Sequence, residues 1–200
     1  MLPNIPTKRT LIHLSMPLII TLLTAFFCPD GSVFGQGAGP ENQLSDIILA
    51  FKRINADSSM RKVVLDESAW GDGETDGGGK LIGYFKGDTL YKMSLWVGLS
   101  YAVVREAYYF DKGSLILVYE SEDDYPGSRA GGGLDHAHPV HTFEGQYYFT
   151  GDKAFKAQLW GAKKMGPDDP HHTTELYHNA HYYYGLLLKK KGSKGLAAIH

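Results

Sequence analysis

The spacing of apolar residues changes once along the chain, from a helical period to a strand period. Apolar residues fall on a single helical face at Leu44, Ile47, Ile48, Phe51 and Ile54. Asn42 can cap this helix, and the polar run 55–59 ends it. From Lys62 to Trp70 apolar and polar residues alternate, which is typical of a half-buried strand. We therefore predict an N-terminal helix followed by a strand.

A motif with two adjacent aromatic residues, a glycine and an apolar residue follows three times, at residues 83–90, 108–115 and 147–155. In each, the aromatic pair closes one strand, and Gly87, Gly113 or Gly151 can take the positive φ of a tight turn. Successive strand residues point to opposite faces, so one ring of each pair should enter the core and the other should cover the outer face. The three motifs predict three β-hairpins.

A second helix is expected after Asp169-Pro170, with an inner stripe of Leu176, Ala180, Tyr183 and Leu187. The polar loop 121–139 is expected to have no fixed structure. Together these patterns predict an α+β fold. It is a meandering antiparallel sheet of about six or seven strands, with the N-terminal helix packed on it and a C-terminal helix. We assign residues 42–188 to this single domain and 189–200 to a flexible basic tail.

The first 35 residues read as a secretory signal peptide. Lys8 and Arg9 precede the apolar run 11–27, and Val33 and Gly35 provide a small-x-small pattern before a cut at Gln36. An uncleaved membrane anchor is the alternative, because about 18 apolar residues can just span a bilayer. We expect an exported bacterial protein, periplasmic or secreted, with residues 36–41 as a linker.

The single cysteine, Cys28, lies at the end of the apolar run. This position suggests lipidation, although Phe27 is larger than the residue that normally precedes a lipidated cysteine. If the leader is removed, the mature chain has no thiol, so disulfides and cysteine chemistry are excluded. Contact with a membrane is then expected only through the leader or weakly through the lysines of the tail.

Composition narrows the function classes further. The net charge of the 200 residues is −2, and nucleic-acid binding normally needs a dense basic face, so we expect no nucleic-acid partner. Tyrosine is common, with 13 copies against 9 of phenylalanine, which favours pleated strands with aromatic surfaces.

Histidine is the first candidate for chemistry. Seven of the nine histidines lie between residues 136 and 181. The runner-up hypothesis is a metal-binding protein or metalloenzyme that uses His136, His138, His178 and His181. Their spacing matches no known metal motif, and on the second helix His178 and His181 fall opposite Leu176 and Leu187. We therefore expect surface histidines and no cofactor.

Acidic residues provide two weaker candidates. Residues 72–77 match the first half of a calcium loop, but position 12 is Gly83 instead of a chelating glutamate. Glu120, Glu122, Asp123 and Asp124 could supply paired carboxylates for sugar cleavage, but we expect a solvated strand end. No G-x-S-x-G elbow marks a hydrolase. The sequence thus favours a protein that is not an enzyme.

The order of these motifs resembles a group of small exported bacterial proteins of unknown function that are built from aromatic Tyr-Phe/Gly hairpins. The resemblance covers roughly residues 42–160. It is carried by the glycine run 77–79 that leads into Tyr84-Phe85, by the segment 105–111 with Gly113, and by Tyr148-Phe149. The resemblance implies the sheet fold and export. It implies no activity and no functional residues.

We expect a binding or envelope-associated module that contacts a protein or a glycan, since aromatic rings give a large contact area at low entropic cost. The residues expected to face outward and bind are Tyr84, Tyr91, Trp96 and Tyr109. A purely structural component of the envelope is the third hypothesis.

Overall fold

The computed structural model describes residues 39–71, 75–128, 131–163 and 169–196. The predicted leader, and residues 72–74 of the calcium-like loop, lie outside the described residues. The core element is a seven-stranded antiparallel sheet in which each strand pairs with its neighbour in the sequence. Its strands are β1 (Arg61–Asp66), β2 (Gly79–Lys86), β3 (Thr89–Gly98), β4 (Ala102–Asp111), β5 (Ser114–Asp124), β6 (Val140–Thr150) and β7 (Lys153–Gly161). The α+β prediction is confirmed, including the meander and the number of strands.

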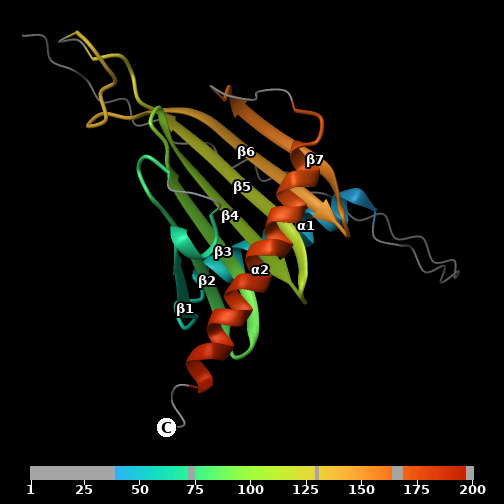
Figure 1. The fold of residues 1–200 in the computed structure, drawn as a ribbon. Helices are drawn as coiled ribbons and strands as arrows, with labels where there is room; N and C mark the ends of the chain where they lie inside the picture. The colour runs from blue at the N-terminus through green and yellow to red at the C-terminus, as the bar shows by residue number, and fades with distance from the viewer. Residues whose placement is uncertain (1–38, 72–74, 129–130, 164–168, 197–200) are drawn as a thin grey trace, which may run out of the picture. The chain divides into compact units, whose positions relative to one another are not determined.

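The two helices lie on opposite faces of the sheet (Figure 1). The helix α1 (Pro40–Ala56) packs on one side, which we call the α1 face. The helix α2 (His172–Leu196) packs on the other, the α2 face. None of the helices in the described part of the chain has an apolar stretch of the length that a bilayer requires.

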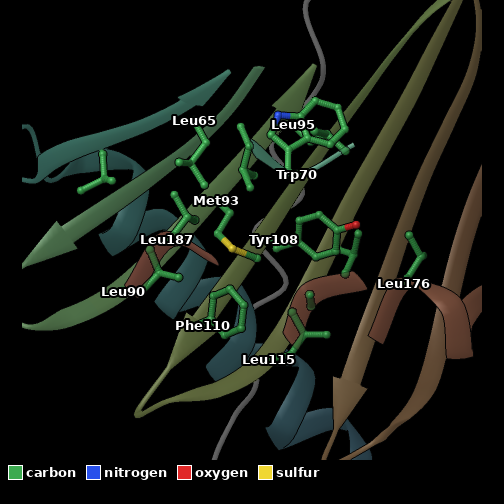
Figure 2. Packing of buried hydrophobic residues seen from close by; sticks show 14 of the residues in the cluster. Leu65, Trp70, Leu90, Met93, Leu95, Tyr108, Phe110, Leu115, Leu176 and Leu187 are labelled. Atoms are coloured by element: carbon green, nitrogen blue, oxygen red, sulfur yellow. The ribbon is translucent and has the colours of Figure 1, made fainter. Parts of the chain in front are cut away.

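The α2 face holds the larger core. The predicted inner stripe of α2 is confirmed, because Leu176, Ala180 and Leu187 are fully buried against the sheet. Figure 2 shows Leu187 beside Leu90 and Met93. Each buried aliphatic side chain of this kind stabilises the fold by about 1.5–3 kcal/mol. Burial of this stripe is what holds α2 on the sheet.

The α1 face has a second, smaller core in which Ile47 and Ile54 contact Tyr109, Leu117 and Tyr148. This corrects the expectation that the second ring of each aromatic pair covers an outer face. Tyr109 is only 4% exposed, because α1 lies over it. The sheet therefore has a core on each side.

All three predicted hairpins form. Each has a two-residue turn with a glycine at positive φ: 58° at Gly87, 82° at Gly113 and 60° at Gly151. Positive φ at the first turn residue suits the twist of the flanking strands. The register shifts by one residue just before each turn, at Tyr84/Phe85, Tyr109/Phe110 and Tyr148/Phe149.

Four boundaries differ from the prediction. The first strand ends at Asp66 instead of Trp70, and a short 3-10 helix, Glu67–Ala69, follows it. α1 begins at Pro40 with Gly39 as its N-cap, so Asn42 lies within the helix. β5 continues to Asp124, so the loop starts later than residue 121. α2 continues through the lysine run to Leu196 instead of ending at residue 188. In this extension Lys191 pairs with Asp88 in the β2–β3 turn and lies over the Phe85 ring.

Candidate functional site: the open part of the α1 face

Helix α1 covers only the part of its face near the hairpin turns, where Tyr109, Leu117 and Tyr148 lie. Beyond it, side chains from β2 to β5 line a groove of about 530 Å³, which we call the open-face groove. Its lining includes Lys80, Lys92, Ser94, Trp96, Arg105 and Tyr119. The strand register places these residues together, since alternate residues of adjacent antiparallel strands share one face.

One row of directly opposed residues crosses this face and extends beyond the groove. It runs from β2 to β7 through Lys80, Trp96, Arg105, Ser121, Glu144 and Trp160. The Trp96 residue is 38% exposed and Trp160 is 60% exposed. Neighbouring strands lie about 4.8 Å apart, so the two indoles are separated by roughly 19 Å across four strand spacings. Two aromatic platforms thus flank a polar stretch.

A chain of contacts fixes the Trp160 end of this row. Arg105 forms an ion pair with Asp123. Asp123 Oδ1 lies 2.8 Å from Nδ1 of His141, and the His141 ring stacks on Trp160 with centroids 5.5 Å apart. His141 and Arg105 hold the pKa of Asp123 below its ordinary value, against the effect of its partial burial. Because these contacts join β4, β5, β6 and β7, the exposed indole is held without a bound partner.

The middle of the face is polar. The Gln146 amide donates to Glu144 at 3.3 Å, and the Tyr148 hydroxyl lies 2.8 Å from Gln146 Oε1 and 3.1 Å from Gln158 Oε1. Burial, together with a hydrogen bond to Glu144, raises the pKa of Tyr119 to about 12. Tyr119 therefore keeps its hydroxyl proton at physiological pH. The hydroxyl, amide and carboxylate groups in the middle of this face can offer both hydrogen-bond donors and acceptors to a ligand.

Two lysines of the groove have no carboxylate partner among the described residues. Lys92 Nζ donates to the side-chain oxygen of Asn55 at 2.9 Å and lies 5.6 Å and 5.1 Å from the ring centroids of Tyr84 and Tyr109. Lys80 is exposed, and although Asp66 lies opposite it in β1, no ion pair joins them. The groove is therefore more positive than the chain as a whole, whose net charge is −2.

The four residues expected to bind occupy different places. Trp96 and Tyr109 line the open-face groove, Trp96 as an exposed ring and Tyr109 as a buried residue in contact with Phe51 of α1. Tyr84 is half-buried on the same face. Tyr91 instead lines a separate groove of about 750 Å³ beside the hairpin turns. The expected outward orientation of Tyr109 is wrong, because α1 packs on it.

The α2 face contains a second polar cluster, in which Glu120 is only 4% exposed. One carboxylate oxygen of Glu120 accepts a hydrogen bond from Lys163. The other lies 2.8 Å from Nε2 of His172 and 3.3 Å from the Tyr147 hydroxyl. The expected solvated strand end is therefore wrong, since Glu120 lies within β5 under α2. Lys163 precedes α2 and His172 begins it, so Glu120 ties the start of this helix to the sheet.

Glu106 lies directly opposite Glu120 in β4, and its carboxylate accepts a hydrogen bond from Tyr108. The pKa of Glu106 is raised to about 7, mainly by burial; the hydrogen bond from Tyr108 opposes the rise and the neighbouring Glu120 charge contributes to it. Burial also acts to raise the pKa of Glu120, but hydrogen bonds from His172 and Lys163 hold it below its ordinary value. Glu120 lines none of the grooves described here, whereas Glu106 is among the residues that line the open-face groove. Because Glu120 contacts Lys163 and His172 at the start of α2, we interpret the cluster as an anchor for α2.

The four histidines of the runner-up metal hypothesis lie outside the Glu120 cluster. All four of His136, His138, His178 and His181 are exposed, which confirms the expected outward direction of the two on α2. His138 pairs with Asp135 at 3.0 Å, and His181 packs on Tyr177. Within the described ranges, no group of three or more histidine, cysteine or acidic residues could hold a metal ion.

Sequence reasoning missed most of the groove. It selected Trp96 and Tyr109, which line the groove, but left out Arg105, Tyr119 and, at the end of the row, Trp160 as binding candidates. The signal that could have found them is strand parity. In β4, Arg105, Ala107 and Tyr109 share one face. Tyr119 of β5 lies on the same face because it pairs with Ala107, and the same rule applies to the next strands. No family model, curated protein or solved structure matches this chain.

Proposed function

We propose that this chain is an exported, non-catalytic binding module that holds a protein or glycan partner on the open-face groove and the adjoining row to Trp160. The observation that carries the proposal is the pair of exposed tryptophans on either side of a polar row, on a face that α1 leaves partly uncovered. Exposed aromatic side chains that a network holds in place are the usual anchors of binding surfaces.

Export rests on the leader. Lys8 and Arg9 with the following apolar run match a signal peptide, and the proposed cut lies before Gln36. The intact mass of the protein recovered outside the cytoplasm should correspond to a chain that begins at Gln36. A mass that includes Cys28 would contradict this cut, and an additional lipid mass on Cys28 would indicate lipidation.

We also infer that the three hairpins are copies of one structural unit. The support is their shared design: an aromatic pair, a register shift at the pair and a two-residue turn with glycine at positive φ. The third hairpin consists of β6 and β7, which contribute Glu144 and Trp160 to the binding row.

The binding proposal is tested by immobilising the protein and measuring how much material it retains from a cell-envelope extract. Wild type and Tyr182→Ala should retain the same components, because Tyr182 is an exposed aromatic residue of α2 and lies outside the groove. Trp96→Ala should retain clearly less. Equal retention by all three proteins would show that the open-face groove is not the binding surface.

A further inference from the structure

The open-face groove and the row to Trp160 also carry information about the chemistry of the ligand. We infer that the partner is an anionic glycan, a chain of acidic sugars such as uronic acids, that lies across the strands from Trp96 to Trp160. This inference rests on the proposed function and specifies its ligand class.

Charge is the first argument. Neither Lys80 nor Lys92 has a carboxylate partner in the described part of the chain, so no acid there neutralises their charges, although Lys92 donates one hydrogen bond to Asn55. Arg105 is paired with Asp123 but remains exposed on the same row, where its guanidinium can also reach a ligand carboxylate. Among the residues that line the groove, Lys80, Lys92 and Arg105 stand against one acidic residue, Glu106, so positive charge is in excess and complementary to a negatively charged partner.

The alternation of aromatic and polar groups is the second argument. A pyranose ring presents a face of C–H groups and a rim of hydroxyls, so it stacks on an indole while its rim is hydrogen-bonded. Glu144 and Gln146 supply such hydrogen-bonding groups between the two indoles, whereas Ser121 of the same row is buried. Since the indoles are about 19 Å apart by strand spacing, only an extended oligomer can contact both.

An acidic peptide is the competing anion, and the face suits it less well. Peptides commonly bind by adding a strand to a free sheet edge or by placing an apolar helix face in an apolar groove. The edges of this sheet are β1 and β7, whereas the binding row runs across the strands and reaches an edge only at Trp160 in β7. The groove itself is lined by two lysines, two serines, an arginine and a glutamate as well as by aromatic and aliphatic side chains, so polar and charged groups interrupt its apolar lining.

The test is isothermal titration calorimetry of the full chain with three probes. The first is a hexamer of galacturonic acid, the second is its methyl ester, which is the same sugar without charge, and the third is poly-glutamate of similar charge. The acid hexamer should bind, with affinity that falls as salt is raised. The ester and poly-glutamate should each bind roughly tenfold more weakly or less.

Variants locate the binding. Trp96→Ala and Trp160→Ala should each weaken the acid hexamer roughly tenfold. The double variant Lys80→Ala/Lys92→Ala should weaken it and flatten its salt dependence. Tyr182→Ala and Lys190→Ala, an exposed aromatic residue and an exposed lysine of α2, are the matched controls and should change nothing. Lys92 contacts Asn55 of α1, so its replacement could destabilise the protein. If Lys92→Ala unfolds the protein, Lys80→Ala alone, which removes an exposed side chain, serves as the test.

Two outcomes would overturn the inference. If poly-glutamate binds as tightly as the hexamer, with the same loss in Trp96→Ala, the partner class is an acidic peptide and the proposed binding function still stands. If the ester binds as well as the acid, or the hexamer does not bind at millimolar concentration, an anionic glycan is excluded. The envelope-retention experiment then decides separately whether the groove binds anything.

Discussion

Glu120 illustrates how a buried carboxylate can be retained inside a sheet. It lies under α2 with both oxygens occupied, by Lys163 on one side and by His172 and Tyr147 on the other. A charge that leaves water without partners costs several kcal/mol, so these contacts are a condition for its presence in β5. The same contacts join the sheet to the first residues of α2.

Replacing Glu120 should therefore destabilise the protein strongly. Glu120→Gln leaves the Lys163 ammonium, which is largely buried, without a counter-charge, and we expect a loss of about 3–5 kcal/mol in the free energy of unfolding. Urea unfolding at pH 7 measures this loss. Asp152→Asn, at an exposed turn residue, is the control and should change the free energy by less than about 0.5 kcal/mol. If the two variants are equally stable, Glu120 does not anchor α2.

Glu106 gives the fold a pH dependence of a particular sign. Its pKa is raised from 4.5 to about 7 in the folded protein, so the folded state retains a proton that the unfolded state has already released. Stability should fall as pH rises from about 4.5 to 7, by up to about 3 kcal/mol, and should then level off. Acids whose pKa is lowered, including Glu120, Asp57 and Asp123, act below this window, where stability falls as the solution becomes more acidic.

The Glu106→Gln variant isolates this effect, because a neutral amide in place of the carboxyl cannot titrate. Its free energy of unfolding, measured from pH 5 to pH 8, should decline less than that of the wild type, and the variant should be the more stable protein at pH 8. Parallel curves for the two proteins would mean that Glu106 does not titrate in this range.

At the scale of elements, α2 is held by apolar burial as well as by Glu120. Leu187 is fully buried against the sheet, whereas its neighbour Leu188 is exposed. We expect Leu187→Ala to lower the free energy of unfolding by about 2–5 kcal/mol through lost burial and a cavity. Leu188→Ala is the matched control and should cost less than about 1 kcal/mol. Equal effects would contradict the orientation of α2.

Most elements could be predicted from local patterns because the signal for them is local. The stripe at Leu176, Ala180 and Leu187 gave the buried side of α2, and the glycines at 87, 113 and 151 gave the hairpins. The end of α2 could not be predicted in this way. The extended part contacts Asp88 through Lys191, and Asp88 lies about a hundred positions earlier in the sequence, so no local pattern reports this contact.

The candidate site was harder to predict for a related reason. Parity along β4 shows that Arg105 and Tyr109 share a face, but not that α1 covers only the second of them. Likewise the acidic run that begins at Glu120 reads as a solvated end. Only the position of His172 and Lys163 over it explains its burial. Both errors concern which helix lies over which part of a face.

At the scale of the whole described fold, the two faces of one sheet differ in how completely they are covered. The α2 face is closed by a long helix with a continuous buried stripe. The α1 face is closed by a shorter helix near the hairpin turns and is open elsewhere, where Trp96 and Trp160 are exposed. Substitution of Trp96 or Trp160 removes little buried surface, so it should weaken binding with little effect on the free energy of unfolding.

The most direct test of this account is hydroxyl-radical footprinting of the full chain with and without a cell-envelope extract, read by mass spectrometry at single residues. The account predicts that oxidation of Trp96 and Trp160 falls severalfold on addition of the extract, whereas Tyr182 on α2 reacts as before. If Trp96 and Trp160 remain as reactive as in the free protein, or if Tyr182 alone is protected, the open part of the α1 face is not the binding surface.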